Sequence, residues 1–323
     1  MFILKALVSI AKIFPGAFLG WGLGANNTSN TFGTAVETGM VKFRDAVIIT
    51  SVFVILGAFL EGEKTFTTVG NIFRDLRPEY VFSISLGTAL SVAFFTRIKI
   101  PISTSQAIVG AILGVGFISG EKLNLAILVK IVICWIATPI GSFIIGYLMY
   151  VLLKWIFSKI RYGITFYNVF IKVGLLVVGA FGAYSLGANN VGTVSGIYSE
   201  HMNMGLSPKM WALIGGIAIS TGVITYSKNV METVGKKITE LAPLMALVAV
   251  LAHAITAYIF THIKVPVSTS QAIVGAVAGV GAVNGLRYVN FKVVTGISMG
   301  WLMTPVLSAV FSCLLFLILK VIL

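Results

Sequence analysis

The chain has 323 residues, of which 58% are hydrophobic and only 10% are charged, and its mean hydropathy is +1.01. Soluble domains carry about 25% charged residues, so the composition excludes an ordinary soluble protein and predicts an integral membrane protein. The net charge of +13 comes from lysines and arginines scattered between apolar runs. This distribution is typical of helix anchors at a lipid surface, and the sequence shows no module for nucleic acid.

Ten apolar runs follow one another along the chain. They cover residues 2–22, 46–60, 80–96, 105–119, 125–153, 167–186, 209–225, 241–261, 270–283 and 291–319. Several reach the roughly 20 residues that a helix needs to span a bilayer. The first run contains Lys5 and Lys12 and lacks a clear small-residue cleavage site, so we expect a retained transmembrane helix and not a signal peptide.

Two kinds of run depart from a simple span. The runs at 105–119 and 270–283 hold only about 15 residues and favour re-entrant or broken helices. The runs at 125–153 and 291–319 are too long for one straight span, and each contains a proline that kinks a helix. We expect either one tilted helix or two short elements from each long run, and about 10 to 12 membrane elements in total.

The chain also contains an internal repeat. PISTSQAIVGAILGVG at 101–116 recurs as PVSTSQAIVGAVAGVG at 266–281, with thirteen of sixteen positions identical and an offset of 165. GANN at 24–27 recurs at 187–190. We therefore predict an all-α integral membrane protein of two homologous repeats, 1–161 and 162–323. An odd number of crossings per repeat would invert the second copy, as in many secondary transporters, although the number of runs alone does not establish inversion.

The polar segment of the longer motif predicts an anion site. A proline disfavours helix just before it, and the serines and threonine that follow are typical of a helix N-cap. The first N–H groups of such a helix lack internal partners and lie at the positive end of its dipole, which suits an oxyanion. Two facing ends would surround one small anion; the alternative is a pair of interfacial caps satisfied by water. The predicted residues are Ser103, Thr104, Ser105, Gln106, Ser268, Thr269, Ser270 and Gln271.

The two GANN motifs add asparagines at membrane depth, where unpaired amides are costly. Gly and Asn let the backbone leave helical geometry, and the freed carbonyls and amide oxygens would suit Na⁺. The amide nitrogens of Asn26, Asn27, Asn189 and Asn190 could also donate to the anion, whereas the alternative is a polar clamp between helices. The predicted Na⁺ ligands are Ala25, Asn26, Asn27, Ser103, Ala188, Asn189, Asn190 and Ser268.

These segments resemble the inorganic phosphate transporter (PiT) family. The resemblance rests on GANN…NTFGTAVETG at 24–39, on the TVG segments at 68–70 and 233–235, and on both P-[IV]-S-T-S-Q motifs. It covers nearly the whole chain. It implies an inverted-repeat symporter that moves inorganic phosphate with Na⁺, or with H⁺ in some bacterial members. It also implies phosphate binding by the two serine-rich segments, with help from the two asparagine pairs.

The chain departs from the family pattern at its acidic positions. The family reads G-A-N-D where Asn27 and Asn190 stand here, and Val54 and Val250 occupy plausible positions of further acids. Asparagine can bind Na⁺ through oxygen but cannot titrate, which favours Na⁺ over H⁺ coupling. A site without a carboxylate could also admit sulfate, so a sulfate permease and a proton-coupled phosphate symporter remain alternatives. Two other acids, Glu37 and Glu200, either serve the site or lie at an interface.

Other classes of protein fit less well. The histidines at 201, 253 and 262 are isolated, and the sequence lacks metalloprotease, serine-hydrolase and nucleotide-binding signatures, so we expect neither an enzyme nor an organic cofactor. A passive anion channel would need no alternating access. Arg97 and His262 are repeat mates before the two motifs, where they either attract anions or reach the interface. We predict a Na⁺-coupled phosphate symporter in the cell membrane, surrounded by lipid, that could form a homodimer.

Overall fold

The computed structural model describes residues 2–73, 76–98, 102–228, 239 and 241–322. Pro101 and the TVG segment at 233–235 lie outside the described residues. The helices of the first half are α1 (Phe2–Asn27), α2 (Ser29–Glu37), α3 (Phe43–Glu61), η1 (Gly62–Thr65), α4 (Phe66–Gly70), α5 (Pro78–Arg97), α6 (Thr104–Ser119) and α7 (Leu125–Lys159). Those of the second half are α8 (Ile164–His201), α9 (Pro208–Tyr226), α11 (Pro243–His262), α12 (Thr269–Ala282), η2 (Leu286–Tyr288) and α13 (Phe291–Ile322).

Most of these helices are long and apolar. Within the described residues, seven helical segments are long and apolar enough to cross a membrane, and α6 and α12 are shorter apolar helices. Together with α1, they reach the lower end of the predicted number of membrane elements. The prediction of short helices after both P-[IV]-S-T-S-Q motifs is confirmed, since α6 has 16 residues and α12 has 14.

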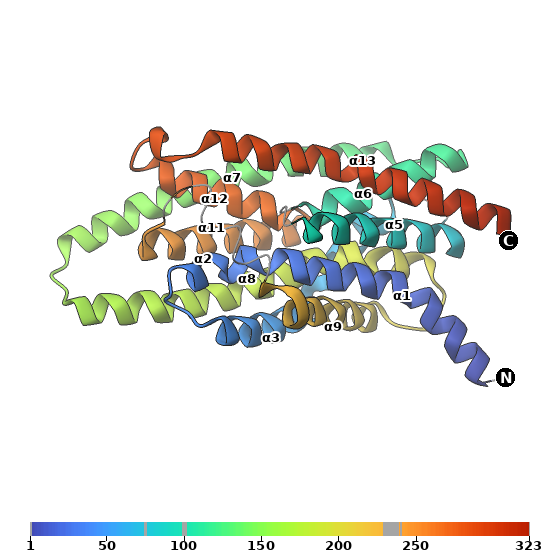
Figure 1. Cartoon of the computed structure of the whole chain (residues 1–323), viewed down its shortest axis with the longest axis horizontal. Helices are drawn as coiled ribbons and strands as arrows, with labels where there is room; N and C mark the ends of the chain where they lie inside the picture. The colour runs from blue at the N-terminus through green and yellow to red at the C-terminus, as the bar shows by residue number, and fades with distance from the viewer. Residues whose placement is uncertain (1, 74–75, 99–101, 229–238, 240, 323) are drawn as a thin grey trace.

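The two halves pack on each other in reciprocal pairs. Helix α6 packs against α13, and its repeat mate α12 packs against α7; in the same way α1 packs against α9, and α8 against α3. In Figure 1, α7 and α13 run in opposite directions along the long axis, as inverted repeats require. Residue 161, the predicted boundary, lies in the short connection between α7 and α8. The division into 1–161 and 162–323 itself stays a prediction.

Each of the two longest apolar runs forms one helix and not two. Helix α7 has 35 residues with Pro139 inside it, and α13 has 32 residues with Pro305 inside it. At 1.5 Å per residue they measure about 50 Å, which exceeds the roughly 30 Å hydrocarbon core of a bilayer. Glycines allow their close approach to the short helices, because a Cβ on Gly275 would lie 2.2 Å from the Pro139 carbonyl oxygen.

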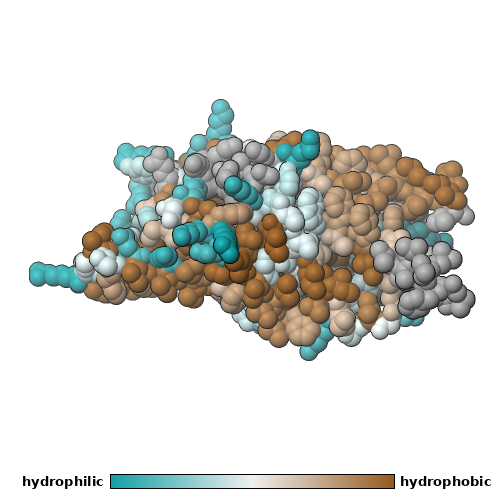
Figure 2. All heavy atoms as spheres, turned by 60° about the horizontal axis from the view of Figure 1, so that its bottom comes forward, coloured by the Kyte–Doolittle hydropathy of each residue, from teal (hydrophilic) through white to brown (hydrophobic). Residues whose placement is uncertain are grey.

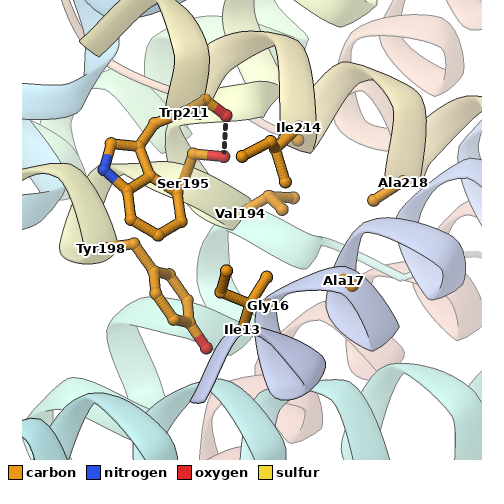
Figure 3. A pocket seen from close by; sticks show the side chains of 10 residues that line it. Ile13, Gly16, Ala17, Val194, Ser195, Tyr198, Trp211, Ile214 and Ala218 are labelled. Atoms are coloured by element: carbon orange, nitrogen blue, oxygen red, sulfur yellow. Dashed lines mark hydrogen bonds between the residues drawn. The ribbon is translucent and has the colours of Figure 1, made fainter. Parts of the chain in front are cut away.

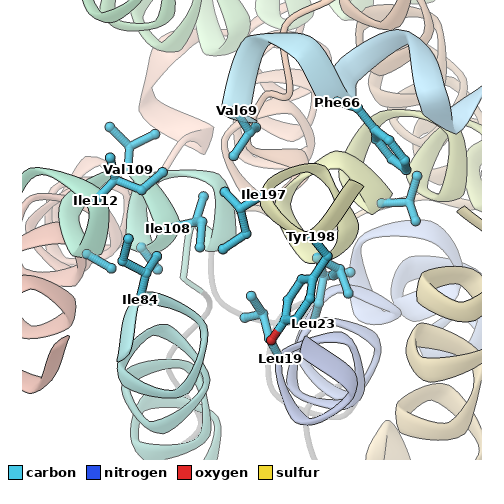
Figure 4. Packing of buried hydrophobic residues seen from close by; sticks show 14 of the residues in the cluster. Leu19, Leu23, Phe66, Val69, Ile84, Ile108, Val109, Ile112, Ile197 and Tyr198 are labelled. Carbon is cyan, nitrogen blue, oxygen red and sulfur yellow. The ribbon is translucent and has the colours of Figure 1, made fainter. Parts of the chain in front are cut away.

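The hydrophobic core forms two clusters, one for each end of the helix bundle. One cluster gathers around Leu19, Phe66 and Tyr198, and Figure 4 shows these side chains converging from α1, α4 and α8. The other contains Phe32 and Ile171. Outside the core, α7 and α13 leave many apolar side chains exposed. Figure 2 shows apolar residues over much of the visible surface, with hydrophilic ones at the protruding tip of the α7–α8 hairpin.

Candidate functional site

The N-termini of α6 and α12 are capped as the sequence predicts. Ser103 is the N-cap of α6, and its hydroxyl oxygen accepts from the Gln106 backbone N–H at 3.2 Å. Ser268 caps α12 in the same way, accepting from the Gln271 N–H at 3.2 Å. The side-chain oxygens replace missing helix partners, so each helix begins abruptly inside the protein.

These two N-termini meet near the middle of the molecule. The Ser270 hydroxyl of α12 lies 2.8 Å from the carbonyl oxygen of Ile102, which directly precedes the α6 cap. From this meeting point α6 and α12 extend toward opposite ends of the molecule (Figure 1). Their lengths are about 24 Å and 21 Å at 1.5 Å per residue. The two short helices together therefore span about 45 Å, with the meeting point near the middle.

Two asparagines of the first repeat join the N-termini of both short helices. The Asn27 amide nitrogen lies 3.5 Å from Thr104 Oγ1, and its amide oxygen lies 3.3 Å from the Ser270 hydroxyl. Asn30 donates to Thr269 at 3.3 Å and to Ser270 at 3.2 Å. The sequence prediction did not include Asn30 in the site. Its signal in the sequence was its position three residues after Asn27, close enough for the two side chains to contact each other at 3.4 Å.

Asn189 holds the segment that leads into α12. Its amide nitrogen donates to Thr261 Oγ1 at 3.2 Å, to the Ala257 carbonyl at 3.3 Å and to the Val265 carbonyl at 3.1 Å. Its amide oxygen accepts from the Val267 N–H at 2.8 Å. These contacts occupy both ends of the side chain, so Asn189 positions the segment before Ser268, as the polar-clamp alternative describes.

Asn26 makes the equivalent contacts in the first repeat. Its amide nitrogen donates to Thr96 Oγ1 at 3.1 Å, and its oxygen accepts from the Ile102 N–H at 3.3 Å. Thr96 and Ile102 are the repeat mates of Thr261 and Val267 at the offset of 165. Each repeat therefore uses the first asparagine of GANN to hold the segment that precedes its own short helix.

Asn190 behaves differently from Asn189. Both its amide nitrogen and its amide oxygen are buried and have no hydrogen-bond partner among the described residues. The same holds for one oxygen each of Asn30, Gln106 and Gln271. Unpaired buried polar atoms are costly, so several of them beside two helix N-termini indicate a place for a polar ligand. Every predicted site residue is at most 6% exposed, and the site is closed to solvent in this conformation.

The expected unwinding at both GANN motifs is wrong for the second copy. Helix α8 runs without a break from Ile164 to His201, so Ala188 lies inside it and its carbonyl belongs to the helical ladder. The first copy ends α1 at Asn27, and Thr28 separates α1 from α2. The structure therefore gives less support to the Ala188 carbonyl as a Na⁺ ligand than to the side-chain oxygens of the predicted set. The Na⁺ ligand set as a whole stays a prediction.

Val54 and Val250, which the sequence places at plausible positions of further acids, are apolar and packed. The Val54 carbonyl would lie 2.1 Å from a Cβ on Gly187, and Val250 lies beside Gly182. Both valines therefore pack on α8 near its GANN motif. Glu200 packs against Gly70, and it is ten residues past Asn190, or about 15 Å along the helix. Glu37 is the last residue of α2.

A separate small cavity lies between α1, α8 and α9. Figure 3 shows Ile13, Tyr198, Trp211 and Ile214 around it, with the Ser195 hydroxyl donating to the Trp211 carbonyl at 2.8 Å. Its volume is about 10 Å³, which is about the space that one water needs. This cavity is too small for phosphate, so it is not a second anion site.

The long apolar helices and the reciprocal packing of the two halves define a multi-pass membrane protein. The model of the phosphate transporter family matches residues 23–312. The chain belongs to this family, which makes it a transporter and not an enzyme. A Methanocaldococcus jannaschii protein named "Putative phosphate permease MJ0630" is 32% identical, over 89% of this chain and 90% of the relative. A Pyrococcus furiosus protein of similar name, PF1020, is 27% identical over 96% and 95%.

A solved structure supports the fold. The structure described as "The sodium-dependent phosphate transporter" superposes with a TM-score of 0.85, covering 97% of this chain and 99% of its own. The sequence identity is 24%, so the likeness concerns the fold. Together with the family match, it confirms the predicted class of all-α, multi-pass membrane protein and the resemblance to phosphate transporters.

Proposed function

We propose that this protein is a Na⁺-coupled symporter of inorganic phosphate, which it holds between the N-termini of α6 and α12. The observation that carries the proposal is the group of buried, unpartnered polar atoms on Asn30, Gln106 and Gln271 at two facing N-termini, together with those of Asn190, the neighbour of the clamp residue Asn189. The helix ends supply N–H donors and positive partial charge to the anion. Asn26 and Asn189 position the two segments by their hydrogen bonds.

The unpartnered oxygens favour phosphate over sulfate. Hydrogen phosphate carries a hydroxyl group that can donate a hydrogen bond, whereas sulfate at neutral pH has only acceptors. A buried amide oxygen, such as those of Gln106 and Gln271, would be satisfied by the phosphate hydroxyl and left unpaired by sulfate. Leaving a buried acceptor unpaired costs about 1–3 kcal/mol, which is roughly a 5- to 150-fold preference.

The unpartnered amide oxygens of Asn30 and Asn190 support Na⁺ as the coupling ion. Na⁺ favours uncharged amide and carbonyl oxygens, and the asparagines at 27 and 190 cannot carry a proton. Na⁺ beside the anion would offset its charge, so that each ligand raises the affinity for the other. The sodium dependence named for the structural relative agrees with this coupling.

Replacing Ser105 or Ser270 by alanine tests the anion site. Each hydroxyl lies in the first turn of its short helix, and Ser270 also contacts Asn27 and the Ile102 carbonyl. We expect the KM for phosphate to rise about tenfold or more, the effect of losing one hydrogen bond to a charged group. Ser142→Ala in α7 is the matched control, because Ser142 is equally buried but belongs to a long helix outside the site. Unchanged uptake in both site variants would refute the assignment.

We also propose that the exposed apolar faces of α7 and α13 contact lipid acyl chains. Their exposed residues include Ile136 and Ile140 on α7 and Leu302 and Val306 on α13. A homodimer built on part of this surface remains a prediction, and the oligomeric state in detergent or nanodiscs would test it.

A further inference from the structure

A charged cluster joins the two repeats outside the anion site. The Glu61 carboxylate, at the end of α3, lies 2.7 Å from the Lys64 ammonium through Oε2. Its other oxygen, Oε1, accepts from the Tyr184 hydroxyl at 2.6 Å and from the Tyr258 hydroxyl at 3.2 Å. His262 Nε2 lies 3.3 Å from the Lys64 ammonium and 3.7 Å from Glu61 Oε2. These five residues are called the Glu61 cluster below.

The Glu61 cluster lies near the clamp residue Asn189 along α8 and α11. Tyr184 precedes the clamp residue Asn189 by five residues on α8, and Tyr258 and His262 flank Thr261, which Asn189 contacts. Charged side chains within transmembrane segments are rare, and they usually pair with each other or face a water-filled cavity on a transport pathway. Here they pair, while the His262 side chain stays 48% exposed.

The contacts of His262 match a ring that carries its proton on Nδ1. Its Nδ1 lies 3.1 Å from the Tyr258 carbonyl oxygen, which can only accept, so Nδ1 carries the proton. Its Nε2 faces the Lys64 ammonium, which can only donate, so Nε2 accepts. A second proton would point Nε2–H at Lys64, and Glu61 Oε2 would be the nearest carboxylate oxygen to receive it.

His262 connects directly to the segment that carries the α12 cap. It is the last residue of α11, and the following segment ends at Ser268. Besides the contacts with Asn189, this segment is held by Thr68, whose hydroxyl donates to the Lys264 carbonyl. Lys264 has a φ of +64°, a left-handed conformation that is strained for a residue with a side chain. The contacts of Thr68 and Asn189 therefore hold this segment in a strained conformation. A displacement of His262 would move the start of the segment.

We propose that Glu61 is a positioning residue for phosphate transport: with Lys64 and the neutral His262 it fixes the segment before Ser268, and protonation of His262 releases it. The proposal rests on the proposed anion site. The other charged or titratable groups near His262 are Tyr258 on its own helix, Tyr184 on α8, the nearby Lys264, and Lys130 of α7, whose ammonium donates to the Ile263 carbonyl at 3.0 Å. Among these groups, Glu61 is thus the carboxylate that would accept a hydrogen bond from a protonated His262.

The test compares the KM for labelled phosphate at pH 8 and pH 6 in proteoliposomes of the wild type, Glu61→Gln and His262→Gln. Acidification also protonates phosphate, but this changes the KM of every variant by the same factor. We expect the ratio of KM at pH 6 to KM at pH 8 to be about fivefold larger in the wild type than in either variant. At pH 8, Glu61→Gln should raise KM and leave kcat nearly unchanged.

Glu63→Gln is the matched control, because it removes an exposed carboxylate from the same turn, outside the Glu61 cluster. It should keep the wild-type ratio. A ratio that is equal in the wild type and in His262→Gln would overturn the proposal, and so would a folded Glu61→Gln that keeps the wild-type KM and ratio. If Glu61→Gln does not fold, His262→Gln decides alone. Na⁺-independent uptake by the wild type would contradict the proposed coupling but would leave this comparison valid.

Discussion

Replacing Asn190 by leucine is expected to abolish phosphate uptake while leaving the protein at least as stable as the wild type. The side chain is 1% exposed, and neither of its polar atoms has a hydrogen-bond partner among the described residues. An unpaired buried amide costs roughly 1–3 kcal/mol, and leucine of similar size removes that cost. A buried amide kept at such a cost next to the residue that holds the α12 cap segment is expected to bind a ligand, so its loss should appear in transport.

Asn189→Leu is the matched control, because both the nitrogen and the oxygen of the Asn189 amide have hydrogen-bond partners. Its loss would leave the Val265 carbonyl and the Val267 N–H without their side-chain partner. We expect this variant to lose about 3 kcal/mol of stability. Thermal unfolding in detergent, together with uptake in proteoliposomes, separates the two cases. An Asn190→Leu protein that transports normally would show that Asn190 is only a packing residue.

Replacing Gly24 by alanine is expected to prevent correct folding. A Cβ at this position would lie 1.8 Å from the Ile219 carbonyl oxygen and 3.0 Å from the Val223 backbone nitrogen of α9. Both atoms belong to the backbone, so α1 and α9 would have to separate. Overpacking of this kind costs about 1–3 kcal/mol or more, and here it falls on α1, the helix that carries Asn26 and Asn27.

The matched control is Gly141→Ala in α7. A Cβ there has no neighbour within 4 Å, and alanine is the better helix former by about 1 kcal/mol. We therefore expect Gly141→Ala to be neutral or stabilising and Gly24→Ala to yield little folded protein. The yield of monodisperse protein and its unfolding temperature measure both. A fully folded, stable Gly24→Ala variant would contradict the close packing of α1 on α9.

The sequence predicts those parts of the site that depend on local rules. The caps at Ser103 and Ser268 follow from the preceding proline and the first-turn geometry, and the internal repeat indicates that the second N-terminus copies the first. The length of the apolar runs predicts the short α6 and α12. These features need no knowledge of distant contacts.

The parts that the sequence did not predict depend on partners far along the chain. The GANN motif ends a helix in the first repeat and continues one in the second, so the same four residues behave differently in the two contexts. Asn30 reaches residues 239 and 240 positions away, and Glu61 reaches Tyr258 197 positions away. No spacing rule indicates such pairings. The internal repeat does not predict the contacts of Asn30 either. Its repeat mate is Thr193, whose hydroxyl donates to the Asn190 carbonyl.

Uptake of labelled phosphate into proteoliposomes tests the central claim most directly. The assay uses an inward Na⁺ gradient, an equal K⁺ gradient as the control, and excess unlabelled sulfate as the competitor. We predict Na⁺-dependent accumulation that saturates and resists sulfate. Accumulation abolished by sulfate would indicate a sulfate or broad oxyanion carrier. Flux indifferent to Na⁺ would contradict Na⁺ symport, and an imposed pH gradient would then separate proton coupling from a passive channel.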